Sequence, residues 1–238
     1  MRVELTQATK NAGKLIADIA SICYGKDEAG DPQRLLEHLY ERGHFSVYEH
    51  AYYTFKIEGV SRVLLAQLTR HRLASPTVRS QRYCDESNIH NIIPPTIAIN
   101  EKAREVFGFG CKTSEYVYRE LIELGIPRED ARYATLQAGE TKLYFSCNFR
   151  EVLHISELRT AKSAQWEIRE LANKIIKLIL GETPELEIVF EAMRKIKRIN
   201  TDRLAEIHNL ICKILDGKIE YLQEARKAKE ELEKVLGY

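Results

Sequence analysis

Strand-like and helix-like patterns alternate irregularly along this chain, and this order constrains the fold more than any other feature of the sequence. Residues 1–7, 52–58 and 142–148 carry the β-branched and aromatic side chains that are typical of strands. Amphipathic helical patterns lie between them, but the succession never settles into a repeated βαβ unit. The sequence therefore predicts an α+β fold and not a doubly wound parallel sheet.

Apolar periodicity and helix-ending residues predict the helices. They cover residues 11–24, 31–43, 61–75, 101–124, 150–158 and 163–180, with one or two further turns at 128–133. Pro76 sets the expected end of the helix over 61–75, because the residue before a proline avoids helical backbone. Residues 75–99 are expected to be loop and short strand, in which Pro94-Pro95 acts as a rigid stop.

The chain from residue 185 onward reads as helical, charged and mixed in sign. We divide the sequence into a main domain over 1–197 and a helical C-terminal extension over 198–238. Two apolar stripes run along the extension, the first denser than the second: Leu204, Ile207, Leu210, Ile211 and Ile214, then Ile219, Leu222, Leu232, Val235 and Leu236. They predict a helical hairpin packed on its own subunit or on a neighbour, and nothing in the sequence supports the alternative of a partner-binding arm.

Charge balance narrows the class of protein. The 36 basic and 35 acidic residues leave a formal charge of +1, which argues against a protein that wraps DNA or lies on a membrane surface. No apolar stretch approaches the roughly 20 residues of a membrane helix, and the opening MRVELTQATK lacks the apolar core of a secretory signal. We therefore expect a soluble cytoplasmic protein without a nucleic-acid or membrane partner.

The five cysteines are scattered, with no CxxC pair, so neither a disulfide framework nor a zinc site is indicated. Each is interpreted as a small buried apolar residue. They are Cys23, Cys84, Cys111, Cys147 and Cys212. Cys147 is the one that lies next to polar residues of interest.

The densest polar motif is RHRLASPTVRSQRY, residues 70–83. It holds four arginines, a side chain whose planar fork matches phosphate oxygens. Gln67, Arg70 and His71 fall at helical spacing and are expected to share one helix face. The motif therefore predicts an anion-binding helix end, the alternative being a solvated basic helix terminus that complements the helix dipole.

Two further motifs are polar. RGHFSVYEH, residues 42–50, offers His44 and His50, but a six-residue step across a turn matches no standard metal-ligand spacing, so contact with a ligand or a plain capped turn is favoured. NFREVLHISELR, residues 148–159, places Arg150 and His154 on one helix face, with Arg159 about 140° further round. Surface decoration is the alternative there.

Together with Arg132, these motifs are rich in Arg, His, Ser and Asn, which suits a phosphorylated, planar, hydrogen-bonding ligand such as a nucleotide. Neither GxGxxG nor a Walker loop is present. One rival is a nucleic-acid or nucleotide-binding module that uses the cluster at 70–82. Another is a serine hydrolase built on Ser80 with His71 or His44, although no G-x-S-x-G element accompanies it.

The order and spacing of these motifs resemble the flavin-dependent thymidylate synthases. RHR followed by seven residues and Ser80 matches the RHR-x7-S signature of that family. RGHFSVYEH matches its GH-x-S/T-x-x-EH element, IPREDAR agrees in position, and NFREVLHISELRTAKSAQWEI matches its N-x-R…R…AQWEI element. The resemblance runs from about residue 10 to about residue 195.

The resemblance implies an enzyme, a methyltransferase of nucleotide biosynthesis that converts dUMP to dTMP. It implies a homotetramer in which several subunits build each active site around tightly bound FAD. Methylenetetrahydrofolate would supply the carbon and NADPH the reducing equivalents, with no cysteine nucleophile and no metal.

By matching positions, the resemblance also implies which residues bind each ligand. FAD would contact His44, Ser46, Arg70, His71, Arg72, Asn148, Arg150 and His154. The substrate dUMP would be held by Gln67, Arg70, Ser80, Gln81, Arg82, Arg132 and Arg159. Arg159 and Ser80 would act in catalysis, and Arg159 would stabilise charge on the pyrimidine by on the order of 3 kcal/mol.

Three departures from the family pattern stand out. Val78 occupies a position, two residues before Ser80, where the family usually has Glu or Gln, so a ligand contact is lost or is taken over by Thr77, Arg79 or a water molecule. The chain reads TLQAGE where many relatives carry Leu-Pro. His154 stands where asparagine is common, and both side chains offer a donor and an acceptor.

Overall fold

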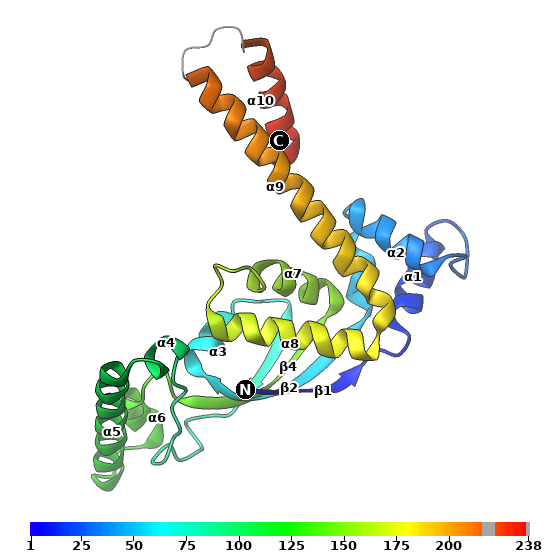
Figure 1. Cartoon of the computed structure of the whole chain (residues 1–238). Coiled ribbons are helices and arrows are strands. Elements are labelled where there is room, and N and C mark those ends of the chain that lie inside the picture. The colour runs from blue at the N-terminus through cyan, green and yellow to red at the C-terminus, as the bar shows by residue number, and fades with distance from the viewer. Residues whose placement is uncertain (216–221, 237–238) are drawn as a thin grey trace.

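The structure is a computed structural model that describes residues 1–215 and 222–236, and it confirms the α+β class (Figure 1). One four-stranded antiparallel sheet has the order β1-β2-β4-β3. Its strands are β1 (Arg2–Ala8), β2 (Tyr52–Ser61), β3 (Ala74–Val78) and β4 (Glu140–Asn148). The helices that precede the C-terminal arm are α1 (Ala12–Ile22), α2 (Pro32–Glu41), α3 (Arg62–Leu68), α4 (Pro95–Ala98), α5 (Glu101–Glu123), α6 (Arg128–Ala131), α7 (Phe149–Arg159) and α8 (Trp166–Glu182), with 3-10 helices η1 (Phe45–His50), η2 (Arg132–Ala134) and η3 (Pro184–Leu186).

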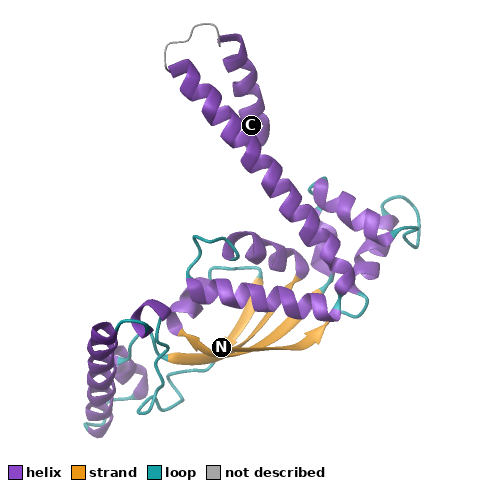
Figure 2. Cartoon of the chain, viewed as in Figure 1, coloured by secondary structure: helices purple, strands orange, loops and turns teal. Residues whose placement is uncertain are grey.

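The two faces of the sheet differ. Helices α7 and α8 lie across one face (Figure 2), where Phe55 of β2 pairs with Phe145 of β4 in the buried core. On the other face Tyr52 and Tyr144 are 56% and 47% exposed. An antiparallel sheet with one packed and one open face needs alternating apolar and polar residues, which is the pattern of these strands.

The prediction of one helix over residues 61–75 is wrong in its length. Ser61 begins the helix as predicted, since its side chain accepts a hydrogen bond from the Leu64 amide, but α3 ends at Leu68. The chain then forms β3, which pairs only with β4 at the edge of the sheet. An edge strand tolerates Pro76, which has no N–H to donate, so the proline marks a strand here and not merely a helix end.

Arg70 and His71 consequently do not share a helix face with Gln67. Both lie in the turn after α3, where the Arg70 and His71 amides donate to the carbonyls of Gln67 and Leu68. Arg70 is exposed and His71 is buried. The early end of α3 therefore points these neighbours in different directions.

Other boundaries differ in smaller ways. Pro95 does not stop the chain but occupies the first turn of the short helix α4, where a missing N–H costs nothing. Helix α5 continues through Gly108 and Gly110 without interruption. Helix α8 begins at Trp166, because the Gln165 side chain accepts from the amides of Glu167 and Ile168.

The expectation that all five cysteines are buried is wrong for four of them. Only Cys147, in β4, is buried; Cys84 and Cys111 are partly exposed, and Cys23 and Cys212 are exposed. Cys23 follows the last turn of α1 and Cys212 lies on the C-terminal arm, so neither faces the core. All five are free thiols.

Helices α9 (Glu187–Leu215) and α10 (Leu222–Leu236) form the C-terminal arm. The first part of α9 packs on α2, and the remainder projects from the body together with α10 (Figure 1). Ile207 and Ala228 are buried between the two helices, as expected of a hairpin, whereas Leu204 is 42% exposed. Ile219 lies outside the described residues. No helix in the described ranges is long and apolar enough to cross a membrane.

Candidate active site

Helix α7 brings a row of polar side chains to the end of the sheet. Its first turn is fixed by Asn148, whose side-chain oxygen accepts a hydrogen bond of 2.9 Å from the Glu151 amide. The Phe149 amide donates to the Ala51 carbonyl at 2.8 Å, which ties the helix to the residue before β2. Glu151 in the first turn also suits the positive end of the helix dipole. Asn148 thus begins the helix that carries Arg150, His154 and Arg159.

The centre of the site is a buried His71–Glu151 pair. The two side chains are 2% and 3% exposed, and His71 Nδ1 lies 2.9 Å from Glu151 Oε1. Arg159 Nε donates to His71 Nε2 at 3.0 Å. Since Nε2 accepts that bond, the imidazole proton is on Nδ1 and is donated to Glu151. Burial lowers the pKa of His71 although Glu151 acts to raise it, and the ring is neutral.

His154 completes this group from the exposed side of α7. Its Nδ1 lies 3.2 Å from Glu151 Oε1, and its ring is 5.4 Å from that of His71. Arg159 and His154 therefore engage the same buried pair at two points, consistent with their different positions around the helix. Glu151 was not among the predicted site residues, although its spacing of three from both Asn148 and His154 could have revealed it.

A cavity of 310 Å³ adjoins this group. Its walls are partly apolar, with Tyr40, Phe45, Leu73 and Leu153 beside Arg150, Glu151, His154 and Glu157. Arg150, in the first turn of α7, forms an ion pair with Glu49 of η1. Phe45 lies between the predicted residues His44 and Ser46, both exposed at the start of η1. The cavity therefore collects residues from all three sequence motifs, since Leu73 belongs to the motif over residues 70–83.

His71, Glu151 and His154 place their donor atoms within 4.8 Å of one another, the composition of a divalent metal site. The sequence prediction of no metal did not consider this set, because it overlooked Glu151. The Arg159 guanidinium beside His71 places positive charge against a metal ion there. Neither His44 nor His50 belongs to the one donor cluster found among the described residues.

A second polar group lies at the far end of β3. The Ser80 side chain accepts from the Arg82 amide at 3.2 Å, and Gln81 Nε2 lies 3.3 Å from the Thr135 hydroxyl. Arg82 forms an ion pair with Glu129, and Arg132 Nε donates to the Glu129 carbonyl at 2.9 Å. This group thus contains the predicted residues Ser80, Gln81, Arg82 and Arg132.

The two halves of the RHR-x7-S motif are therefore separated within one protomer. The five residues of β3 lie between them, an extended length of about 17 Å. Ser80 cannot pair with His71 of the same chain, which removes the intrachain Ser80–His71 form of the serine-hydrolase alternative. Two of the four motif arginines, Arg79 and Arg82, are paired with carboxylates, so the basic surface is smaller than the sequence suggests.

A buried contact between α8 and the start of α3 also helps to position His71. Glu167, buried in the first turn of α8, accepts from both the Ser61 amide at 2.7 Å and the Ser61 hydroxyl. This carboxylate fixes the start of α3, and α3 leads directly to His71. Glu167 is a positioning residue that sequence reasoning missed, although it is the acidic residue of the AQWEI element.

Comparison with known proteins identifies the class. The family model described as thymidylate synthase complementing protein matches residues 4–185, which contain both polar groups. A flavin-dependent thymidylate synthase of Geobacter sulfurreducens is 38% identical over 197 residues, covering 78% of this chain and 85% of the relative. Proteins of the same name from Pyrococcus furiosus (38% over 189 residues, 74% and 78% covered) and Clostridium tetani (35% over 211 residues, 78% and 85% covered) are also similar. The chain belongs to the flavin-dependent thymidylate synthase family.

Proposed function

We propose that this enzyme converts dUMP to dTMP by reductive methylation, with methylenetetrahydrofolate as carbon donor, FAD as bound cofactor and NADPH as reductant. The observation that carries the proposal is the buried His71 side chain, held between Glu151 and Arg159 beside the 310 Å³ cavity. A planar ring system with polar edges matches this combination of apolar walls and convergent hydrogen-bonding groups.

The residues at the cavity fit a flavin. Tyr40 and Phe45 supply aromatic wall, and Arg150 and His154 supply charge and hydrogen bonds. Residues His44, Ser46, Arg70, Arg72 and Asn148 are proposed as further contacts on the strength of the family pattern. When bound, FAD would supply the relay of methylene and hydride that the side chains themselves cannot provide.

The group at the far end of β3 would hold dUMP. Arg82 and Arg132 suit its phosphate, because the guanidinium fork matches phosphate oxygens. Ser80 and Gln81 supply neutral hydrogen-bonding groups next to them, and Gln67 and Arg70 would contact dUMP from the end of α3. Thr77 and Arg79 flank Val78; Arg79 is already paired with Glu86, so Thr77 is the better placed to replace the contact that valine lacks.

Arg159 would stabilise negative charge on the pyrimidine. Its Nε is held by neutral His71, and its Nη atoms donate to no residue in the described part of the chain. A guanidinium fixed at one nitrogen by a buried partner is preorganised toward a developing anion. Charge stabilised in this way would make the pyrimidine C5 carbon nucleophilic without a covalent bond from the protein. Burial raises the pKa of Cys147 to about 12, so the one buried thiol is a poor nucleophile.

A homotetramer would bring the separated halves together, with His71 of one protomer facing Arg82 of another. Helix α5 offers an apolar surface for such assembly, since Val106 and Phe109 are 74% and 75% exposed. A test mixes two inactive variants, His71→Ala and Arg82→Ala. If the site is shared, hybrid tetramers regain up to about a quarter of wild-type sites; no recovery would contradict a site shared between protomers in this way.

The proposed reaction is tested by the visible absorbance of the protein and by its turnover of dUMP. The purified protein is expected to be yellow, to lose its visible absorbance on anaerobic addition of NADPH, and to release tritium from dUMP labelled at C5 only when the folate is present. A colourless protein that binds RNA or DNA in a salt-dependent way would instead support the nucleic-acid module. The five cysteines of the chain are all free thiols, which is consistent with our proposal that the enzyme acts in the reducing cytoplasm.

We also propose that residues 198–238 form an extension with a role separate from the reaction. The family match ends at residue 185, and α9 runs without a break through the proposed boundary. Deleting 198–238 should leave the flavin spectrum and dUMP turnover measurable, whereas loss of both would make the arm part of the catalytic body.

A further inference from the structure

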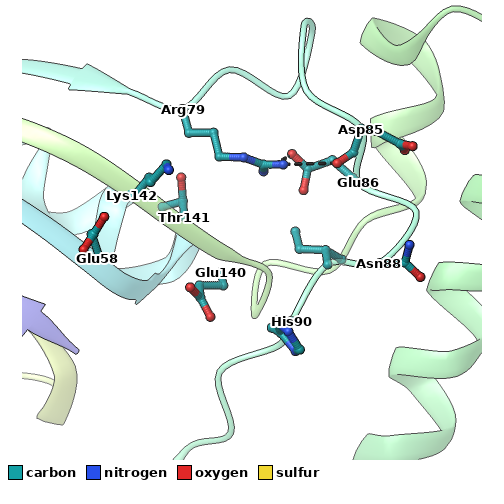
Figure 3. Close-up of a pocket in the computed structure, with 10 residues that line it drawn as sticks. Glu58, Arg79, Asp85, Glu86, Asn88, His90, Glu140, Thr141 and Lys142 are labelled. Atoms are coloured by element: carbon teal, nitrogen blue, oxygen red, sulfur yellow. Dashed lines mark hydrogen bonds and ion pairs between the residues drawn. The ribbon is translucent and has the colours of Figure 1, made fainter.

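A polar cavity of 550 Å³ lies at the end of the sheet away from His71. It is bounded by the first residues of β4, by Glu58 of β2 and by the loop that follows β3 (Figure 3). Arg79 reaches across it to an ion pair with Glu86, and the Thr141 hydroxyl points from β4 toward the side where Arg79 lies. None of the residues proposed to hold FAD or dUMP lines this cavity.

Two buried polar side chains in its wall are left without full hydrogen bonding. Glu86 is 1% exposed and Thr141 is 2% exposed. Glu86 Oε1 pairs with Arg79, but Glu86 Oε2 and Thr141 Oγ1 have no hydrogen-bond partner among the described residues. A buried acceptor without a donor is costly, so each is a position where a ligand can supply the missing bond.

The walls are held in place by contacts independent of any ligand. Arg79 Nη2 donates to the Asp85 carbonyl at 3.1 Å, and the Glu140 amide donates to the His90 carbonyl at 2.7 Å. A Cβ added at Gly139 would lie 2.7 Å from Ile89 Cδ1 and 3.1 Å from the Leu136 carbonyl oxygen, so the loop packs closely where it approaches β4. The cavity is thus built into the fold and is not a gap between mobile side chains.

The charged side chains that line the cavity disfavour binding of the anionic substrates of the proposed reaction. Four carboxylates line it, from Glu58, Asp85, Glu86 and Glu140, against the cations of Arg79 and Lys142. The phosphates of dUMP and NADPH and the carboxylates of folate would meet net repulsion. A metal ion is no better match, because the one cluster of close metal-donor atoms among the described residues is at His71. An organic cation with several N–H donors meets both requirements.

We propose that this cavity binds a small aliphatic diamine, an organic cation distinct from every substrate of the proposed reaction. One ammonium group donates to Glu86 Oε2 and Thr141 Oγ1. The alkyl chain lies against Ile89, and the second ammonium group reaches Glu140 or Glu58. The site adjoins Ser80 through Arg79, so an occupant is linked by one residue to the group proposed for dUMP.

The test is calorimetric titration of the full chain with 1,4-diaminobutane. Saturable binding of one molecule per protomer is expected, with none for uncharged 1,4-butanediol at the same ionic strength. Thr141→Val, which removes only the hydroxyl, and Glu86→Gln should each weaken binding at least tenfold. Thr141→Ser keeps the hydroxyl and should bind the diamine as the wild type does. Glu187→Gln, an equal loss of charge on the arm, should leave the affinity unchanged.

The proposal is overturned if the wild-type chain does not bind the diamine at millimolar concentration, if the diol binds equally well, or if Glu187→Gln weakens binding as much as Glu86→Gln. Thr141→Val keeps the test valid should Glu86→Gln fail to fold, and unchanged affinity in a folded Thr141→Val protein would also overturn it. Visible flavin absorbance and dUMP turnover are measured separately, so failure here does not depend on the proposed reaction.

Discussion

The two ends of β3 make an instructive comparison. At the His71 end, the imidazole, the Glu151 carboxylate and the Arg159 guanidinium satisfy one another inside one protomer. At the other end, the Arg82 side chain is 58% exposed and its partner Glu129 is 42% exposed. Exposed ion pairs are weak, contributing about 0–1 kcal/mol. One end is therefore rigid before any ligand arrives, whereas the other is a surface that a ligand or a neighbouring protomer can rearrange.

The largest expected effect tests the rigid end. Arg159→Ala should lower turnover by on the order of 100-fold or more while flavin binding stays detectable, because a preorganised guanidinium is lost. Tritium release from C5-labelled dUMP measures turnover, and visible absorbance measures the flavin. Arg194→Ala, on the exposed side of α9, is the matched control. Near-normal turnover in Arg159→Ala would remove this residue from catalysis.

The next largest effect is on the free energy of unfolding, at the contact between α8 and the start of α3. Glu167→Gln retains one acceptor for Ser61 but turns an amide N–H₂ toward the second donor, so unfolding free energy should fall by about 2 kcal/mol. Urea denaturation at one fixed protein concentration measures this loss. The same change at exposed Glu170, also in α8, should cost little, and equal losses at both positions would contradict a special role for the Ser61 contact.

At the exposed end the effect should be smaller. Ser80→Ala removes a hydroxyl that the structure uses only to accept from the Arg82 amide, so the reaction should slow about tenfold or need correspondingly more dUMP. Steady-state kinetics with varied dUMP separates the two cases. Trapping a covalent serine adduct in the wild-type enzyme would contradict the mechanism, and a 100-fold loss would mean that this end is as preorganised as the other.

The smallest effect is a pH dependence. Burial holds the pKa of His71 below its usual 6.5 in the folded chain, so the neutral ring stabilises the fold fully above that pH. This contribution is lost as pH falls from 6.5 through the lower folded value, because the unfolded chain takes up the proton first. The unfolding free energy of His71→Asn should depend less on pH across this window than that of the wild type. Identical slopes would show that His71 is not held neutral.

Sequence reasoning recovered the class of fold and the locations of most elements because periodicity and capping residues are local. It placed Ser61 at the start of α3 correctly, but it extended the helix to residue 75 because the edge position of β3 depends on a long-range pairing with β4. The distinction between buried Cys147 and the other cysteines likewise depends on tertiary packing.

The candidate site divides in the same way. Family motifs indicated His71, Arg82, His154 and Arg159, and the structure brings His71, His154 and Arg159 together. Glu151, Glu167 and the Arg79–Glu86 pair were missed, since a carboxylate becomes informative only when its donor on another segment is known. Separation of the motif halves by β3 could not be predicted while residues 61–75 were read as one helix.

The uninterrupted course of α9 has a mechanical consequence. A helix of 29 residues is a rod about 43 Å long, and only its first turns are anchored to α2, where Lys195 meets Glu41 at 2.8 Å. A fluorophore or affinity handle attached near the distal turn of this rod would be carried roughly 25 Å beyond the turns that pack on α2. The rod thus offers a place to tether or observe the protein well away from α2.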